Sequence, residues 1–276
     1  MAQRLIGAGY SLKVYNRTRA AAEPLARSGA QVAAQAGELL DAEIVVTMLA
    51  DDAAVAAVWL DSGLAARMPR DAIHLNMATI SMEIARRLGS AHARSGSHYV
   101  SAPVFGRPPV AAQGQLDVIA AGPAAALERC QPLLKAMAKQ VFVVGEEPAK
   151  ANAVKIARNF LLATIIESLG EAFALVRKSG VDAGKFLEVL TSTSLNAPAY
   201  RNYGKMIVDG AWQPALFAMT LGLKDVELAL ATARETGVPL YSGELIKANL
   251  QKAIAAGRGD QDWVALAGHI AAESGL

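Results

Sequence analysis

The sequence has a single cysteine, Cys130, among its 276 residues. One thiol cannot form an intramolecular disulfide framework or a C-x-x-C metal site. The four histidines, which are His74, His92, His98 and His269, also lack the short spacings that are typical of metal ligands. The sequence therefore predicts a protein without disulfides and without a bound metal.

An excess of charge of either sign is also lacking. The 27 lysines and arginines nearly balance the 25 aspartates and glutamates, which leaves a net charge of +2. This balance argues against a nucleic-acid-binding surface. Charges and glycines interrupt the apolar stretches well before the ~20 residues that cross a bilayer, and residues 1–6 lack the apolar core of a signal peptide. We expect a soluble, cytoplasmic protein whose partners are small molecules, and neither nucleic acid nor a membrane.

What the sequence does have is 53% hydrophobic and 19% charged residues, enough apolar material for a sizeable core. Between residues 1 and 147, short apolar runs alternate with helix-like stretches. This rhythm predicts an α/β fold of the Rossmann type, with a doubly wound parallel sheet. The predicted strands are 12–15, 31–32, 43–49, 72–76, 98–100, 116–121 and 140–144, and the longer predicted helices are 82–95 and 124–137.

The alternation of strand-like and helix-like stretches ends at residue 147, and we predict an all-helical second domain from residue 148 to residue 276. Residues 149–178 contain neither a proline nor a strand-like alternation, so they are predicted to form one helix of roughly 45 Å. A helix of this length needs packing along several sides, which favours a homodimer built through the helical domain. Its apolar residues include Phe160, Leu161, Ile165, Leu169 and Phe173. Further helices are predicted at 182–191, 223–236, 241–256 and 263–273.

The usual opening of a dinucleotide-binding fold is not found in the chain. Such a fold begins with a strand, a G-x-G-x-x-G turn and a helix. Here the only close pair of glycines near the start, Gly7 and Gly9, follows a helical run and is typical of a helix end followed by a turn. We expect the first strand and the glycine turn to be absent, through an internal start site or a truncation. The chain as given is then expected to bind NADPH poorly.

Polar residues nevertheless follow the predicted strands. Asn16, Arg17 and Thr18 come directly after the first of them, where NAD enzymes carry an acidic residue. An amide does not repel a phosphate, and Arg17 can form a charge-assisted fork with one, although a solvated turn is the alternative. This turn favours NADP(H) as the cofactor. Thr79 is a candidate for a hydrogen bond to the nicotinamide ribose, and Ser81 for a helix cap.

Lys155 is the candidate proton donor. Lys155 and Asn159 are four residues apart, so they share one face of the long helix. A lysine that a bound cofactor partly shields can protonate a carbonyl oxygen as a hydride arrives, which is general acid catalysis. Asn159 is interpreted as the residue that orients Lys155 or holds the substrate. The alternative for Lys155 is a solvated lysine on a surface helix.

Seven short motifs follow one another along nearly the whole chain. They are Asn16-Arg17-Thr18, Met48-Leu49-Ala50, Ala78-Thr79-Ile80-Ser81, residues 101–106 (S-A-P-V-F-G), residues 155–159 (K-I-A-R-N), residues 223–226 (L-K-D-V) and residues 257–262 (G-R-G-D-Q-D). Each motif alone is weak. The ordered set resembles the β-hydroxyacid dehydrogenase family, the group of 3-hydroxyisobutyrate dehydrogenase and glyoxylate/succinic semialdehyde reductase.

The resemblance implies an NADP-dependent oxidoreductase that transfers a hydride between nicotinamide and a carbonyl compound or hydroxy acid. It implies Lys155 and Asn159 as the catalytic residues. For Lys224 and Asp225, a charge pair at a helix start is the alternative. The implied substrate-binding residues are Ser101, Pro103, Val104, Phe105, Gly106 and Asp225. The implied cofactor-binding residues are Asn16, Arg17, Thr18, Met48, Leu49, Ala50, Thr79 and Lys224.

Two positions depart from the family pattern. Phe105 stands where the family has a serine that grips a substrate carboxylate, and Ser101 where it has an aspartate. Because a phenyl ring cannot donate a hydrogen bond, we expect a substrate larger or less polar than a short 3-hydroxy acid. Arg107 is a candidate for binding an anion, and the alternative is an exposed residue without a ligand. The alternative functions are an imine reductase, a group that typically lacks the lysine, and a non-catalytic truncated dimer.

Overall fold

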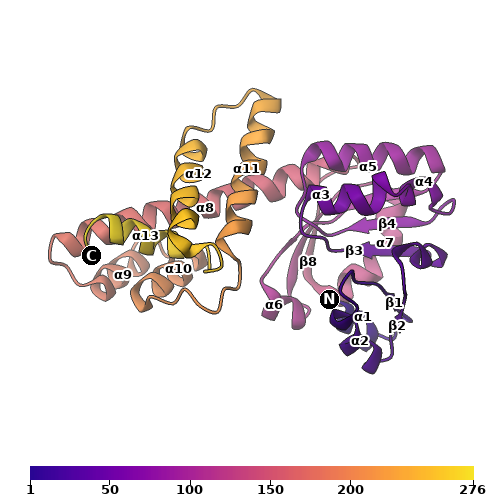
Figure 1. Ribbon diagram of the computed structural model, residues 1–276, viewed down its shortest axis with the longest axis horizontal. Helices are drawn as coiled ribbons and strands as arrows, with labels where there is room; N and C mark the ends of the chain where they lie inside the picture. The colour runs from indigo at the N-terminus through magenta and orange to yellow at the C-terminus, as the bar shows by residue number, and fades with distance from the viewer. The chain divides into compact units, whose positions relative to one another are not determined.

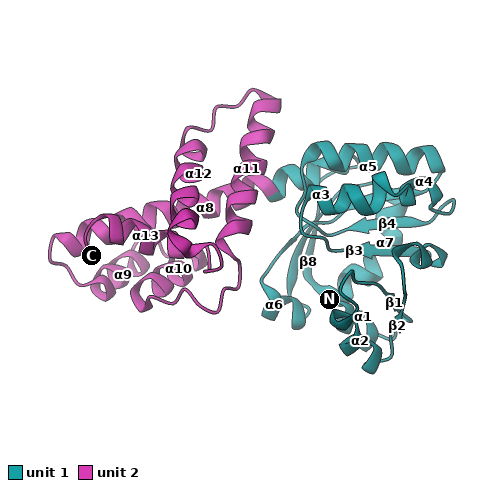
Figure 2. Ribbon diagram, viewed as in Figure 1, with its two compact units in different colours: residues 1–155 teal, residues 156–276 magenta.

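The computed structural model describes residues 1–276, which form two compact units, unit 1 (residues 1–155) and unit 2 (residues 156–276) (Figure 2). Unit 1 combines strands with helices, and unit 2 is helical (Figure 1). The division falls inside the longest helix, α8 (Ala149–Lys178). The boundary predicted from the sequence, after residue 147, lies just before the start of this helix.

Unit 1 contains short parallel sheets, as the alternating sequence predicts. β3 (Ile44–Thr47), β4 (Ile73–Asn76) and β5 (His98–Ser101) pair in parallel, in that order. β6 (Val104–Phe105) runs antiparallel to β7 (Leu116–Ala120), which pairs in parallel with β8 (Ala138–Val143). A bridge between Ser101 and Ala121 connects the end of β5 to the end of β7. The parallel α/β class is therefore confirmed, with one antiparallel strand added.

Helices cover both faces of the β3–β4–β5 sheet. Alternate residues of a strand point to opposite faces, so Ile73 and Leu75 enter a core with α1 and α7, while His74 and Asn76 face the side of α5. The helices of unit 1 are α1 (Ala2–Gly7), α2 (Glu23–Arg27), α3 (Asp52–Val55), α4 (Leu64–Arg67), α5 (Met82–Ser95), α6 (Pro108–Ala112) and α7 (Ala124–Met137). Shorter turns are η1 (Arg19–Ala21), η2 (Ala36–Asp41) and the π-helix η3 (Ala56–Asp61).

β1 (Lys13–Val14) pairs only with β2 (Gln31–Val32), and this pair is separate from the β3 sheet. Between β1 and β3 lies a cavity of about 580 Å³. Its wall includes Leu12 and Val14 from one side and Ile44 and Val46 from the other. Strand β1 is thus much shorter than the four residues predicted, because only two of its residues find a partner strand.

Unit 2 packs its helices around one apolar core. Ile166, Leu169 and Phe173 of α8 lie in this core with Trp263 and Leu266. The other helices are α9 (Ala183–Ser192), α10 (Pro198–Asp209), α11 (Met219–Thr236), α12 (Tyr241–Ala253), the π-helix η4 (Ile254–Arg258) and α13 (Ala265–Glu273). The all-helical second half is confirmed.

Two sequence-based expectations need correction in the helical part. Helix α10 was not predicted, although Pro198 at its first turn is compatible with a helix start. Helix α8 is also long and apolar enough to cross a membrane by length and composition, whereas no stretch of that length was expected. Core helices of soluble proteins pass the same test, and Leu169 and Phe173 of α8 are buried in unit 2, so this is weak evidence for a span.

Candidate active site

The carboxyl ends of β3 and β4 meet at Thr47 and Asn76. Thr47 Oγ1 donates a hydrogen bond of 3.4 Å to Asn76 Oδ1, which also accepts one of 3.0 Å from the backbone N–H of Ala78. The backbone N–H of Met77 donates to Thr47 O at 2.8 Å. This edge is where parallel sheets bind ligands, and these bonds fix the turn that leaves it. The sequence analysis did not identify Asn76 as a site residue, because its position at the site depends on a hydrogen bond to Thr47 in another strand.

The predicted cofactor residues of unit 1 lie at these strand ends. Met48, Leu49 and Ala50 follow β3, and Met48 is exposed; Thr79 follows β4 and is half-buried. Ser81 caps α5 as predicted, since its Oγ accepts a hydrogen bond from Ile84 N at 3.1 Å. Ser81 is therefore a structural residue.

The turn after β1 holds the predicted cofactor residues Asn16, Arg17 and Thr18. Asn16 Nδ2 donates to Thr18 O at 2.8 Å, so the turn is closed by its own side chain. Arg17 between them is exposed, and no carboxylate stands in the turn. By contrast, Gly7 ends α1 and Gly9 follows with a φ of +87°, as the helix-end interpretation predicts. A guanidinium without a neighbouring carboxylate and the polar residues at the ends of β3 and β4 are compatible with an NAD(P) cofactor, and no glycine-rich diphosphate turn is formed among the described residues.

Ser101 and Asn152 join the start of α8 to the sheet of unit 1. Ser101 Oγ donates to Asn152 Oδ1 at 2.6 Å, and Asn152 Nδ2 donates to Ile80 O at 3.2 Å. All three residues are buried. The resemblance implies Ser101 as a substrate-binding residue, but its hydroxyl proton is already donated to Asn152. The first turn of α8 is consequently held against the loops that follow β4 and β5.

Lys155 lies one turn further along α8 and is 8% exposed. Its Nζ donates a hydrogen bond of 2.9 Å to Val104 O and lies 4.6 Å from the centre of the Phe105 ring. Both contacts come from β6, so the predicted substrate loop, residues 101–106, meets the predicted proton donor. Pro103 and Val104 are buried, Phe105 is half-buried and Gly106 is exposed. A buried ammonium held by the loop differs from the solvated lysine that was the alternative.

In unit 2, Asn159 Nδ2 donates to Asp225 Oδ2 at 2.6 Å. Lys224 Nζ lies 3.1 Å from Asp225 Oδ1. Asn159 and Asp225 are both buried, which makes this a charge-assisted network rather than a surface pair. Helix α11 begins at Met219, four residues before the predicted start. Lys224 and Asp225 therefore lie in its second turn, and they are not the charge pair at a helix start that was the alternative.

The closing motif, residues 257–262, is structural in unit 2. Asp262 is buried, and its Oδ2 accepts hydrogen bonds from the backbone N–H groups of Leu216 and Phe217 at 3.1 and 3.2 Å. Asp262 Oδ1 accepts from Val264 N at 3.3 Å. This carboxylate therefore fastens the segment before α11 to the start of α13.

A buried polar network in unit 1 was not foreseen from the sequence. His74 Nε2 lies 2.7 Å from Thr47 Oγ1, and the His74 ring stacks on Trp59 at 3.7 Å. His74 Nδ1 is 3.1 Å from His92 Nε2, and His92 Nδ1 is 2.8 Å from Ser97 Oγ. Burial lowers the pKa of His92 to about 4 and that of His74 well below its ordinary value.

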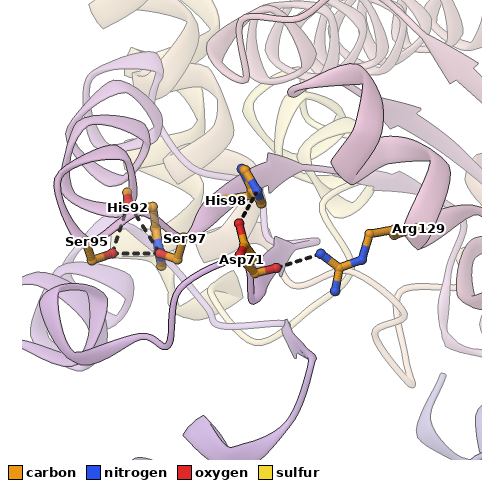
Figure 3. A network of polar contacts seen from close by, with 6 residues as sticks. All are labelled: Asp71, His92, Ser95, Ser97, His98 and Arg129. Carbon is orange, nitrogen blue, oxygen red and sulfur yellow. Dashed lines mark hydrogen bonds and ion pairs between the residues drawn. The ribbon is translucent and has the colours of Figure 1, made fainter.

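Figure 3 shows the outer end of this network, with Ser95 and Ser97 beside His92. A second group lies nearby, where Arg129 Nη1 donates to Asp71 O at 2.6 Å and His98 Nε2 lies 3.9 Å from Asp71 Oδ1 (Figure 3). Asp71 precedes β4 and His98 begins β5, so this second group sits at the amino ends of the strands. It is at the opposite end of the sheet from the candidate site, and its contacts are structural in kind.

Two family descriptions match consecutive parts of the chain. Residues 1–145 match the NAD binding domain of 6-phosphogluconate dehydrogenase. Residues 149–270 match the "NAD-binding of NADP-dependent 3-hydroxyisobutyrate dehydrogenase". Together with the parallel sheet and the helical second half, these matches define an NAD(P)-binding oxidoreductase.

Individual relatives agree with this class. An uncharacterized oxidoreductase of Bacillus subtilis, YfjR, is 44% identical over 269 residues, which cover 96% of this chain and 93% of the relative. The NAD-dependent L-serine dehydrogenase of Pseudomonas aeruginosa is 32% identical, over 86% of this chain and 83% of its own. The structure of Mycobacterium tuberculosis 3-hydroxyisobutyrate dehydrogenase with L-serine is 26% identical, with a TM-score of 0.88 over 97% of this chain and 93% of that one. The chain belongs to the β-hydroxyacid dehydrogenase family, whose members are NAD(P)-dependent dehydrogenases that act on hydroxyl groups.

Proposed function

We propose that this protein interconverts a hydroxy acid and its carbonyl form, with NADP(H) as the cofactor and Lys155 as the general acid and base. The observation that carries the proposal is the buried ammonium of Lys155, which donates to Val104 O within the 101–106 loop. An ammonium in this position can donate a proton to a carbonyl oxygen bound at the loop. The Lys155 position also supports a dehydrogenase over the imine reductase alternative, which typically lacks the lysine.

The bound nicotinamide would supply or accept the hydride. In the reduction, Lys155 Nζ gives a proton to the substrate oxygen, and in the oxidation it takes that proton back. Val104 O stabilises the protonated lysine and limits the directions in which its N–H groups can point. The Ser101–Asn152–Ile80 chain holds the first turn of α8, so Lys155 keeps its place relative to β6. General acid catalysis of this kind contributes about 10²–10⁴-fold to a rate.

The other assigned residues are proposed in supporting roles. Asn159 and Asp225 hold each other in unit 2, and Lys224 is oriented by the same carboxylate, which suits a residue that contacts a cofactor. Asn16 and Arg17 support NADP(H), because the turn offers a guanidinium and no carboxylate to a 2′-phosphate. Met48, Leu49, Ala50 and Thr79 are proposed to line the nicotinamide side.

We also propose a homodimer in the cytoplasm. Two of the α8 residues on which the predicted dimer was based, Leu169 and Phe173, are buried in the core of unit 2 and cannot contact a partner. Leu161 and Leu175 are 58% and 69% exposed on the same helix. A second copy that covers them removes apolar surface from water, which is the main favourable term in association.

The decisive experiment is the replacement of Lys155 by methionine, which keeps the length and apolar stem of the side chain. We expect Lys155→Met to lower kcat by about 10²–10⁴-fold in the full-length protein while the Kd for NADPH stays near normal. Lys150→Met, on the exposed side of the same helix, is the matched control and should retain full activity. A Lys155→Met protein that keeps more than about a tenth of the parent rate would refute the assignment.

A further inference from the structure

We propose that Phe105 is the positioning residue of the proton donor, and that its ring holds the Lys155 ammonium in place. For its effect on turnover, this inference rests on the proposed role of Lys155. The contact itself stands on the structure alone. A phenyl ring carries negative charge density on its face, which attracts a cation within about 6 Å of the ring centre.

The geometry meets this requirement. Lys155 Nζ lies 4.6 Å from the Phe105 centroid and donates at 2.9 Å to Val104 O, the carbonyl of the preceding residue. Two adjacent residues of β6, Val104 and Phe105, therefore contact the ammonium. Because Lys155 is 8% exposed, the attraction is screened less by water than at a surface.

Strand β6 is short but well fixed, so its ring has little freedom to move away. Val104 pairs with Val118 and Phe105 with Asp117 across β7. Gly106 follows with a φ of +135°, and a Cβ there would lie 2.7 Å from a methyl carbon of Leu116. Only glycine fits this turn, and the turn sets where the preceding ring is placed. The ring also packs on the small apolar cluster of Ile119, Ala121 and Ala151.

The chemistry of phenylalanine suits a positioning role better than substrate binding through a polar group. A serine at this position would form a directional hydrogen bond and could grip a carboxylate, whereas a phenyl ring can do neither. The ring attracts the charge of Lys155 without donating a hydrogen bond of its own. Phe105 thus couples the loop that faces the substrate to the group that moves the proton.

The contact can be tested without any turnover. Lysines are labelled by reductive ¹³C-methylation, and the Lys155 resonance is assigned from its loss in Lys155→Arg. A methylated ammonium over a ring face should resonate upfield of the other lysines. The displacement should vanish in Phe105→Leu, persist in Phe105→Tyr and persist in Phe142→Leu, which removes an exposed ring of β8 in the same unit. A Lys155 resonance at the ordinary lysine position, or one unchanged in Phe105→Leu, overturns the proposal.

Kinetics of the same variants test the consequence for the reaction. We expect Phe105→Leu to lower kcat by about 2- to 30-fold, the range of a partly desolvated cation–π contact, with the KM for NADPH unchanged. Phe105→Tyr keeps the ring and should stay within about 2-fold of the parent, like Phe142→Leu. If Phe105→Leu matches the parent while Lys155→Met is inactive, the positioning role is wrong and the proposed function survives. If Lys155→Met stays active while the upfield shift is present, the proposed function fails and the contact remains.

Discussion

Two buried imidazoles, those of His74 and His92, share a hydrogen bond of 3.1 Å between Nδ1 and Nε2 in the core of unit 1. The bond requires at least one neutral ring, because two imidazolium groups would each present only N–H donors. Burial disfavours the charged form of both and lowers both pKa values, and the nearby His92 lowers the pKa of His74 further. Thr47 at one end links this pair to the carboxyl edge of the sheet.

The histidine pair predicts that unit 1 loses stability in mild acid. In the unfolded chain a histidine has a pKa near 6.5, and His92 in the fold has a pKa of about 4. The stabilising contribution is therefore complete above pH 6.5 and is lost as the pH falls from there toward 4. His92 alone should lower the free energy of unfolding by on the order of 2 kcal/mol between pH 7 and pH 5, and His74 acts in the same direction. Urea unfolding followed by tryptophan fluorescence measures the change.

Matched variants separate this effect from general acid titration. His92→Leu should lower stability at pH 7, because Ser97 and His74 lose a partner, yet flatten the pH dependence between 7 and 5. His98→Gln is the matched control, because it replaces a partly exposed histidine beside Asp71 that lies outside the buried pair. Equal slopes for His92→Leu and the parent would contradict the prediction.

Arg17 is predicted to set the preference for NADPH over NADH. Loss of its contact with a 2′-phosphate should cost about 1.5–3 kcal/mol, so Arg17→Ala should weaken NADPH binding by about 10- to 150-fold. NADH lacks this phosphate and should bind about as before. Arg19→Ala, two residues further along in η1, is the matched control. Calorimetric titration of the full-length protein with both cofactors decides the matter, and similar losses for the two cofactors would count against Arg17.

Leu161 and Leu175 are predicted to lie in a dimer interface on α8. Each carries a largely exposed apolar side chain on the one helix that spans most of unit 2. A charge buried in an interface without a partner is costly, so Leu161→Glu with Leu175→Glu should give a monomer at micromolar concentration. Val189→Glu on α9 replaces an equally exposed apolar residue and should leave the dimer intact. Light scattering measures the mass, and a parent protein that is already monomeric would refute the dimer.

The β1–β2 pair is predicted to open more easily than the β3–β4–β5 sheet. Gln31 N donates to Leu12 O and Ala33 N to Val14 O, beside the cavity. Met77 N, by contrast, donates to Thr47 O between two well-covered strands. Exchange of the first two amides should be faster by about 100-fold or more, because few buried contacts oppose local opening there. Residue-resolved hydrogen exchange by NMR tests this, and equal protection of all three amides would show one cooperative unit.

The sequence by itself determined the class of fold and the location of most candidate residues. Alternating apolar and helical runs predict parallel strands, and residues just after neighbouring strands of one such sheet gather at one edge, as Met48 and Thr79 do after β3 and β4. The absence of proline and of strand-like alternation in residues 149–178 predicted α8 with its observed bounds. These signals are local, because each depends on the residue's neighbours along the chain.

Only the tertiary structure decided what those residues contact. Ser101 and Asn152 are 51 positions apart, as are Lys155 and Val104, so no periodic pattern could pair them. Nothing in the sequence shows that Phe105 faces an ammonium rather than a substrate. The same holds for His74 and His92, whose burial follows from how α5 packs on β4. Long-range contacts depend on the summed packing of the whole unit, and a short motif carries no record of its distant partner.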